Sequence, residues 1–276
     1  MLLSVVIPAF NEEQRIPLFL PKLISKLNEY CPRSFEIIIV DDGSTDRTAQ
    51  ISQQLLGNYG RILRLPQNYG KGRAMRTGVM TAQAQYVCIT DADGSIGMTA
   101  FSQAMGILQS SALPGVIGTR YLGNQDLEIA INWKRLIAGK AFAQIARLIL
   151  GLHYSDTQCG FKAFNTPFAK RLFEACKSEK FGIDFELLYI SQINGIRYVE
   201  LPVEWREMPD SKVRIFTDGF RMLREMLQLR FAEKRSLQLP IYSLDRVNAL
   251  PVTADLDESE TFKSNDNQKK DRITAP

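Results

Sequence analysis

The sequence predicts an α/β fold: a doubly wound, mostly parallel sheet with helices on both faces. Nearly continuous apolar runs recur through the first half of the chain, which is typical of strands covered on both faces. Amphipathic stretches long enough for crossover helices separate these runs. Such alternation favours parallel strands joined by helices.

The first half alternates regularly between the two kinds of element. Strands are predicted at residues 3–8, 35–40, 61–65 and 86–90. Helices are predicted at residues 16–30, 46–56, 71–82 and 99–109. Because ligands bind outside the carboxyl ends of the strands in such sheets, the residues that follow each strand are the most informative.

The second half is less regular. Helices are predicted at residues 133–150, 167–176, 185–194 and 219–231, with a turn at 159–162 and a strand at 197–205. One domain is expected over residues 1–235, ending on an amphipathic helix at about 219–231. Residues 236–276 turn polar, and we expect a disordered tail there.

Composition excludes several classes of protein. The formal charge of +4 on 276 residues is mild, so nucleic acid is not an expected partner. The four cysteines form no CxxC pair, which indicates neither a disulfide framework nor a zinc site and fits a cytoplasmic location. No stretch approaches the ~18 uncharged apolar residues that cross a bilayer. Any membrane contact is therefore expected to be peripheral.

Two carboxylates one residue apart, Asp91 and Asp93, follow the strand at 86–90. About one such triplet is expected by chance in a chain of this composition, so position is the stronger argument. Carboxylates this close repel unless a cation lies between them, and hard oxygen ligands together with substrate phosphates suit Mg²⁺ or Mn²⁺. The alternative is that one of them caps the next helix.

Two further segments suggest a nucleotide ligand. Asp41 and Asp42 end a strand, where a carboxylate can accept hydrogen bonds from a ribose or a base. The alternative is a turn at Gly43 and a helix capped by Ser44 or Thr45. In the segment 68–74, two glycines and two cations, Lys71 and Arg73, lie where a helix begins, an arrangement that can present backbone N–H groups and charge to a phosphate.

Several segments together resemble a family 2 glycosyltransferase with a GT-A fold. They are SVVIPAFNE at 4–12, VDDGSTD at 40–46, NYGKG at 68–72 and DADG at 91–94. GTR at 118–120, DTQCGFK at 156–162 and FELLY at 185–189 resemble the dolichyl-phosphate β-glucosyltransferase branch, close to dolichol-phosphate mannose synthases. EWR at 204–206 and DSK at 210–212 extend the resemblance to roughly residues 3–230. Each segment alone is unspecific, but the set is specific.

The resemblance implies a role for each of several residues. The nucleoside would be held by Pro8, Asn11, Glu12, Asp41 and Asp42. Lys71 would lie near the nucleoside or its phosphates, and Asp91 and Asp93 would hold the metal and the diphosphate. The acceptor phosphate and the charge of the leaving diphosphate would be met by Arg120, Arg135, Arg206, Ser211 and Lys212. Asp184 occupies a place where many relatives carry a base, and it is equally well placed to cap the helix that follows.

The implied reaction moves a hexose, glucose first and mannose next, from a UDP- or GDP-linked sugar to a polyprenyl or dolichyl phosphate at the cytoplasmic membrane face. Inversion in one displacement is expected. A phosphate acceptor is already ionised near neutral pH, so the single histidine, His153, is not needed as a base.

Several alternatives stay open. The acceptor would instead be a soluble sugar or a glycan, or the protein would bind nucleotide-sugars without catalysis. Arg206 and Lys212 would then be solvated surface cations. The helices at 133–150 and 219–231 would lie on a membrane, or their apolar stripes would pack on the protein's own core. In the second helix the stripe comprises Phe220, Leu223, Leu227 and Phe231.

Overall fold

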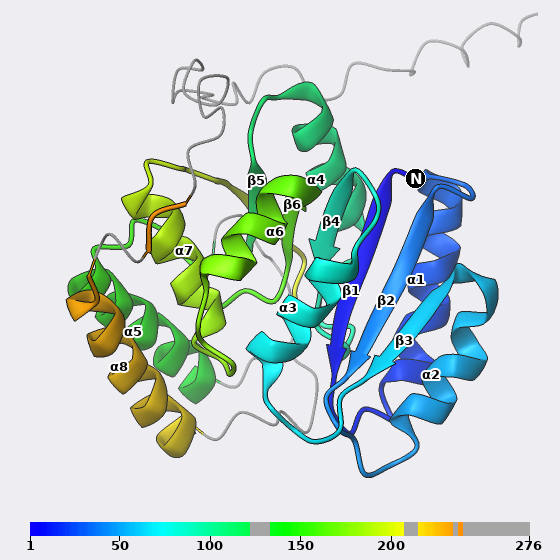
Figure 1. The fold of residues 1–276 in the computed structure, drawn as a ribbon, viewed down its shortest axis with the longest axis horizontal. Helices are drawn as coiled ribbons and strands as arrows, with labels where there is room; N and C mark the ends of the chain where they lie inside the picture. Colours follow the sequence, from blue (N-terminus) through cyan, green and yellow to red (C-terminus); the bar gives the residue numbers. More distant parts are fainter. Residues whose placement is uncertain (122–132, 207–214, 234–236, 240–276) are drawn as a thin grey trace, which may run out of the picture.

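The computed structural model describes residues 1–121, 133–206, 215–233 and 237–239 (Figure 1). Within these residues seven strands form one sheet in the order β3-β2-β1-β4-β6-β5-β7. The strands are β1 Leu3–Ala9, β2 Phe35–Asp41, β3 Gly60–Arg64, β4 Tyr86–Ile89, β5 Gly115–Thr119, β6 Lys162–Asn165 and β7 Val199–Pro202. Four of the strand pairs are parallel, and only those that β6 makes with β4 and β5 are antiparallel.

Helices cover both faces of the sheet. They are α1 Ile16–Tyr30, α2 Thr48–Leu56, the short 3₁₀ helix η1 Gly57–Tyr59, α3 Lys71–Thr81, α4 Thr99–Ser110, α5 Trp133–Leu150, α6 Thr166–Ala175, α7 Ile183–Ile193 and α8 Ile215–Phe231. Alternate residues of β1 divide between two cores: Val5 and Ile7 pack with α1 and α4, whereas Val6 packs with α3, α6 and α7. Helices α5 and α8 contact each other beside α7 (Figure 1). The predicted fold class is confirmed.

The sheet places its ligand crevice between β1 and β4. From β1 the chain proceeds outward through β2 and β3, and it then returns to β4 on the other side of β1. The strand order therefore reverses between β1 and β4, and a crevice opens outside the carboxyl ends of the strands at such a point. The segments after β1, β2 and β4 meet there.

Two strands were not predicted. The strand β5 is five residues long with a glycine at each of two positions, and β6 is four residues long, so neither produces a long apolar run. The turn expected at 159–162 leads directly into β6. The strand expected at 197–205 is shorter, because β7 ends at Pro202 and Trp205 makes only an isolated bridge to Ile96.

Residues 237–239 of the expected tail lie on the folded core. Leu237 and Leu239 are buried, and the Asn194 side chain bonds the Leu237 carbonyl and the Leu239 N–H. The remaining residues of the tail lie outside the described part. None of the described helices combines the length and the apolar character needed to cross a bilayer.

Candidate functional site

The loops after β1 and β2 are joined by hydrogen bonds. The Asn11 N–H donates to Ser44 Oγ at 2.9 Å, and Asn11 Oδ1 accepts the Thr45 N–H at 2.9 Å. The Glu12 N–H donates to Thr48 Oγ1 at 2.6 Å, while the Glu12 carboxylate pairs with Arg15. Pro8, which was also expected to hold the nucleoside, lies within β1 opposite Val40 of β2. These contacts bring the expected nucleoside residues of the two loops side by side.

The adjacent carboxylates of Asp41 and Asp42 have different hydrogen-bond partners. Asp41 is fully buried; its Oδ1 accepts the Ser44 N–H, and its Oδ2 lies 3.2 Å from the Arg64 side chain without hydrogen-bond geometry. Asp42 accepts the N–H groups of Tyr69 at 2.9 Å and Gly70 at 2.7 Å. Burial raises the pKa of Asp42, and these two N–H groups offset part of that rise. Asp42 therefore anchors the loop before α3.

The alternatives in which Ser44 or Thr45 caps α2, and Asp91 or Asp93 caps α4, are wrong. Ser44 Oγ is occupied by the loop after β1, and Asp46 rather than Ser44 or Thr45 accepts the Thr48 N–H where α2 begins. Helix α4 begins at Thr99, too far along the chain for Asp91 or Asp93 to cap it.

The glycines at the start of α3 serve close packing. A Cβ on Gly70 would lie 2.6 Å from the Glu179 carbonyl oxygen, and one on Gly72 would lie 2.5 Å from that of Ser178. The Gly70 N–H is already bound to Asp42. The expectation that these glycines present N–H groups to a phosphate is therefore corrected for Gly70. They let the segment 178–180 approach α3, and the charge available to a ligand is that of Lys71.

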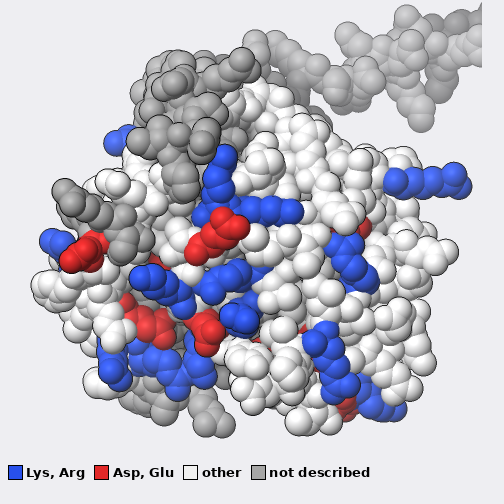
Figure 2. Space-filling model, viewed as in Figure 1, with Lys and Arg blue, Asp and Glu red and all other residues white. Residues whose placement is uncertain are grey.

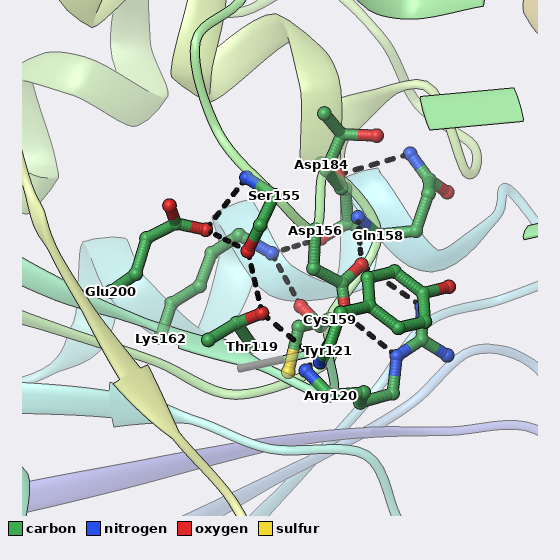
Figure 3. Close-up of polar contacts among 11 residues, drawn as sticks. Thr119, Arg120, Tyr121, Ser155, Asp156, Gln158, Cys159, Lys162, Asp184 and Glu200 are labelled. Atoms are coloured by element: carbon green, nitrogen blue, oxygen red, sulfur yellow. Dashed lines mark hydrogen bonds and ion pairs between the residues drawn. The ribbon is translucent and has the colours of Figure 1, made fainter. Parts of the chain in front are cut away.

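Lys71 joins two carboxylates. Its Nζ lies 2.9 Å from Asp91 Oδ1 and 3.4 Å from Asp184 Oδ2. Asp184 Oδ1 in turn binds Lys162 Nζ at 2.5 Å, and Lys162 also donates to the Cys159 carbonyl (Figure 3). Burial would lower the pKa of Lys71, but Asp184 and Asp91 outweigh it and raise that pKa, so the ammonium stays charged.

Asp184 does not cap α7. That helix has Gly182 as its N-cap and begins at Ile183, and the Asp184 carboxylate bonds the two lysines instead. Burial raises the pKa of Asp184, but Lys162 and then Lys71 outweigh burial and hold that pKa below its usual value. Asp184 is 2% exposed, so its contacts are made inside the protein.

Asp91 and Asp93 suit a divalent cation. Asp91 keeps 34% of its side chain exposed, and Gly160 leaves room for it, because a Cβ there would lie 2.1 Å from Asp91 Oδ2. Burial and then Asp91 raise the pKa of Asp93, whose Oδ1 accepts the Ser95 N–H. A cation would relieve that repulsion. The described residues contain no cluster of three or more ligating side chains, so diphosphate oxygens and water would have to complete the shell.

Arg120 is largely committed to a structural contact. Its Nε and one terminal nitrogen bind the two oxygens of Asp156 at 2.7 and 2.9 Å (Figure 3). Its guanidinium also lies over the rings of Tyr121 and Trp205, at 5.5 and 5.6 Å. A phosphate would reach only the remaining edge of this guanidinium. Sequence reasoning did not identify Asp156 as its partner.

The backbone of Arg206 is linked through Ser95 to Asp93. Its N–H donates to the Ser95 carbonyl at 2.8 Å, and Ser95 in turn binds Asp93. The side chain of Arg206 is exposed. Arg135 belongs to α5, but its side chain is outside the described part, as are Ser211 and Lys212 altogether.

Lys162 and Gly160 belong to the site and were not named as site residues from the sequence. The signal was available in the segment 156–162, where a lysine follows two apolar or small positions and begins a strand. A buried lysine needs a carboxylate partner, but sequence spacing does not identify Asp184 as that partner.

Comparison with known proteins agrees with this geometry. The model of the family described as Glycosyl transferase family 2 matches residues 4–173. A dolichyl-phosphate beta-glucosyltransferase of Dictyostelium discoideum is 35% identical over 242 residues, covering 83% of this chain and 74% of that protein. The human protein of the same name is 31% identical over 247 residues, with the same two coverages.

Solved structures share the fold at low identity. Glucosyl-3-phosphoglycerate synthase from Mycobacterium tuberculosis, crystallised with Mn²⁺, uridine-diphosphate and glucosyl-3-phosphoglycerate, matches with a TM-score of 0.58 and 23% identity. That match covers 83% of this chain and 79% of the other. S. aureus TarS 1-349 matches with a TM-score of 0.53 and 19% identity, covering 86% of this chain and 68% of that one.

Proposed function

This chain belongs to glycosyl transferase family 2, and we propose that it transfers glucose from UDP-glucose to the phosphate of dolichol or a related polyprenol. The family resemblance and the GT-A fold are confirmed. The chain is thus an enzyme, a hexosyltransferase. The observation that supports the donor site best is the meeting of Lys71, Asp91 and Asp93 outside the carboxyl ends of the central strands.

The donor's diphosphate would lie beside Lys71 and the two aspartates. Asp91 and Asp93 would hold Mg²⁺ or Mn²⁺, which when bound stabilises the negative charge of the departing nucleoside diphosphate. Lys71 adds a permanent positive charge on the same side. The loops after β1 and β2, which carry Asn11, Glu12 and Asp41, would receive the nucleoside, because the hydrogen bonds between these loops fix their relative positions.

The acceptor would be a phosphate monoester. It is ionised near neutral pH, so the attacking oxygen needs no proton removed, and inversion follows from a single displacement. His153 is exposed in the loop after α5 and is not required in this scheme. Arg206 would receive the acceptor phosphate, since its backbone is bonded to Ser95 beside Asp93.

Peripheral contact with the cytoplasmic face of a membrane is part of the proposal. In α8 the core is contacted by Met222, Met226 and Leu229, whereas Phe220, Leu227 and Phe231 are 74%, 43% and 83% exposed. The expected stripe therefore does not pack wholly on the core, and Leu148 of the neighbouring α5 is also exposed. Arg221, Arg224 and Arg230 of α8 are exposed as well, and Figure 2 shows basic and acidic side chains intermixed on this face of the molecule. Apolar and basic residues together suit a lipid interface.

Radiolabelled UDP-glucose and GDP-mannose, each assayed with dolichyl phosphate and with soluble sugar acceptors, test the proposal. We expect chloroform-extractable product from UDP-glucose and dolichyl phosphate, lost in excess chelator and lost in Asp93→Asn without a change in melting temperature. Product that stays in the aqueous phase would instead favour a soluble acceptor. Nucleotide-sugar binding without any turnover would favour a non-catalytic protein.

The acceptor site is tested by Arg206→Glu. Reversing this charge replaces a charge-assisted contact with repulsion, so transfer at limiting dolichyl phosphate should fall by roughly tens- to hundredsfold. Binding of UDP-glucose, measured by calorimetry, should change much less. Lys170→Glu, a change in α6 at a partly exposed position, serves as a control for charge reversal itself. Equal loss of donor binding and transfer would remove Arg206 from the acceptor site.

A further inference from the structure

Four charged side chains of alternating sign form a line from the interior to the donor site. In order they are Lys162, Asp184, Lys71 and Asp91. The side chains are 3%, 2%, 14% and 34% exposed in that order, so only Asp91 is open to a ligand. The line begins inside the protein and ends on one of the two aspartates that would hold the metal.

Lys162 determines how strongly Asp184 holds Lys71. Lys162 Nζ donates hydrogen bonds to Asp184 Oδ1 at 2.5 Å and to the Cys159 carbonyl at 2.7 Å, so one oxygen of Asp184 is already neutralised. Lys71 is left with the other oxygen at the longer distance of 3.4 Å, and its closer partner is Asp91 at 2.9 Å. A buried ammonium cannot stay without a counter-ion, so Lys71 turns toward Asp91.

A divalent cation on Asp91 would compete with this contact. Its two positive charges would lie within a few ångströms of the Lys71 ammonium, and like charges at such a distance repel strongly in a partly buried site. The bond to Asp184 would remain, so Lys71 could leave Asp91 without losing its last counter-ion. The nearest new negative charge is then the donor's diphosphate.

We infer that Lys71 is a resident counter-ion of Asp91 that the donor's metal displaces toward the diphosphate, and that Asp184 and Lys162 are positioning residues that hold Lys71 for this exchange. The inference rests on the proposed function for the identity of the donor. It predicts that removing the charge of Lys71 strengthens the binding of Mn²⁺ alone and weakens the binding of UDP. A loss of local structure would instead weaken both.

The test measures the binding of Mn²⁺ alone, followed by the EPR signal of the free ion, and the binding of UDP in the presence of Mn²⁺ by calorimetry. Lys71→Met should bind Mn²⁺ alone roughly tenfold more tightly, because a competing charge is gone, and UDP roughly tenfold more weakly. The variant should fold, because Asp184 keeps Lys162 and Asp91 is partly exposed. Lys71→Arg, which keeps the charge, should bind Mn²⁺ as the wild type does.

Two further variants sharpen the test. Arg73→Met removes a cation two positions further along α3 that is 46% exposed and pairs with Glu179, and it should leave Mn²⁺ affinity unchanged. Lys162→Met frees Asp184 for Lys71 and should draw Lys71 away from Asp91. Mn²⁺ should then bind severalfold more tightly, a smaller effect than in Lys71→Met.

The inference is overturned if Lys71→Met leaves Mn²⁺ affinity unchanged or weakens it while the variant melts like the wild type. It is also overturned if Arg73→Met produces the same gain. The transfer assay separates this failure from failure of the proposed function. If the wild type transfers glucose to dolichyl phosphate but Lys71→Met shows no gain in Mn²⁺ affinity, only the proposed displacement of Lys71 is refuted. If Lys71→Met gains Mn²⁺ affinity but the wild type shows no transfer, the proposed reaction is refuted and the displacement of Lys71 is supported.

Discussion

Several buried carboxylates around the site bind backbone N–H groups. Glu186 accepts those of Lys177 and Ser178, as Asp42 accepts those of the loop before α3. Burial raises the pKa of Glu186, and the two N–H groups oppose that rise. The loops around the proposed donor site are therefore held by acidic side chains from neighbouring elements.

Asp184→Asn should lower the free energy of unfolding by about 3 kcal/mol near neutral pH, because two buried lysines lose their shared counter-ion. The folded-state pKa of Asp184 lies below its usual value of 3.8. Its stabilising effect is thus complete above that pH and is lost as the pH falls through the lowered pKa. Urea unfolding of both proteins from pH 7 to pH 3 measures this. A difference that does not shrink below about pH 4 would contradict the assigned ion pair.

Residue types at strand ends were predictable, but their partners were not. Asp91 and Asp93 were expected at the end of a strand, and the structure brings Asp91 to 2.9 Å from Lys71; the role of the two aspartates in holding a metal stays a prediction. Lys162 is distant in sequence from Asp184, and only the folded sheet brings the two together. The role of Arg120 was likewise expected from resemblance, whereas its pairing with Asp156 required the structure.

At the scale of elements, the junction of α3 with the segment 178–180 depends on glycine. Gly70 has φ of +121°, and a Cβ there would meet the Glu179 carbonyl at 2.6 Å. Gly70→Ala should therefore cost about 2 kcal/mol or more. Gly106→Ala in α4 is the matched control, since nothing lies within 4 Å of its Cβ position, and it should stabilise by about 0.5–1 kcal/mol. Chemical denaturation of both variants measures the difference, and equal effects would refute the packing argument.

The outward face of α8 should bind lipid without supporting the fold. Replacing both Phe220 and Phe231 by Ser should reduce sedimentation with anionic vesicles at least about tenfold. The melting temperature should stay unchanged, because both side chains are more than 70% exposed. Met226→Ala, in the buried face of the same helix, should instead lower stability by about 3 kcal/mol and leave vesicle binding of the folded protein intact. Unchanged sedimentation of the double variant would refute the membrane face.

Sequence patterns located the strands that form unbroken apolar runs and missed β5 and β6, which do not. Strands β1, β2 and β4 are buried on both faces and produce apolar runs that predict them. Strand β5 contains Gly115 and Gly118, and each glycine lets another residue approach closely, Phe164 in the first case and Cys159 in the second. Close approach of this kind is a tertiary property, so local pattern does not indicate it.

At the scale of the whole molecule, catalysis should not depend on the last residues of the chain. The segment 253–276 is polar and lacks periodic apolar positions, which predicts no packed structure of its own. A protein ending at residue 252 should keep its rate of glucose transfer and its melting temperature. A folded truncation that loses most of its turnover would assign the tail a role.

The position of β6 has a consequence for synthesis on the ribosome. Strand β6 lies between β4 and β5, although both precede it in the chain, and it hydrogen-bonds to each of them. Until residue 165 has emerged, β4 has an open edge and β5 has no place in the sheet. An exposed edge of this kind invites pairing with another chain. Nascent chains shorter than about 165 residues should therefore need protection by chaperones, and a fragment that ends before β6 should be a poor candidate for separate expression.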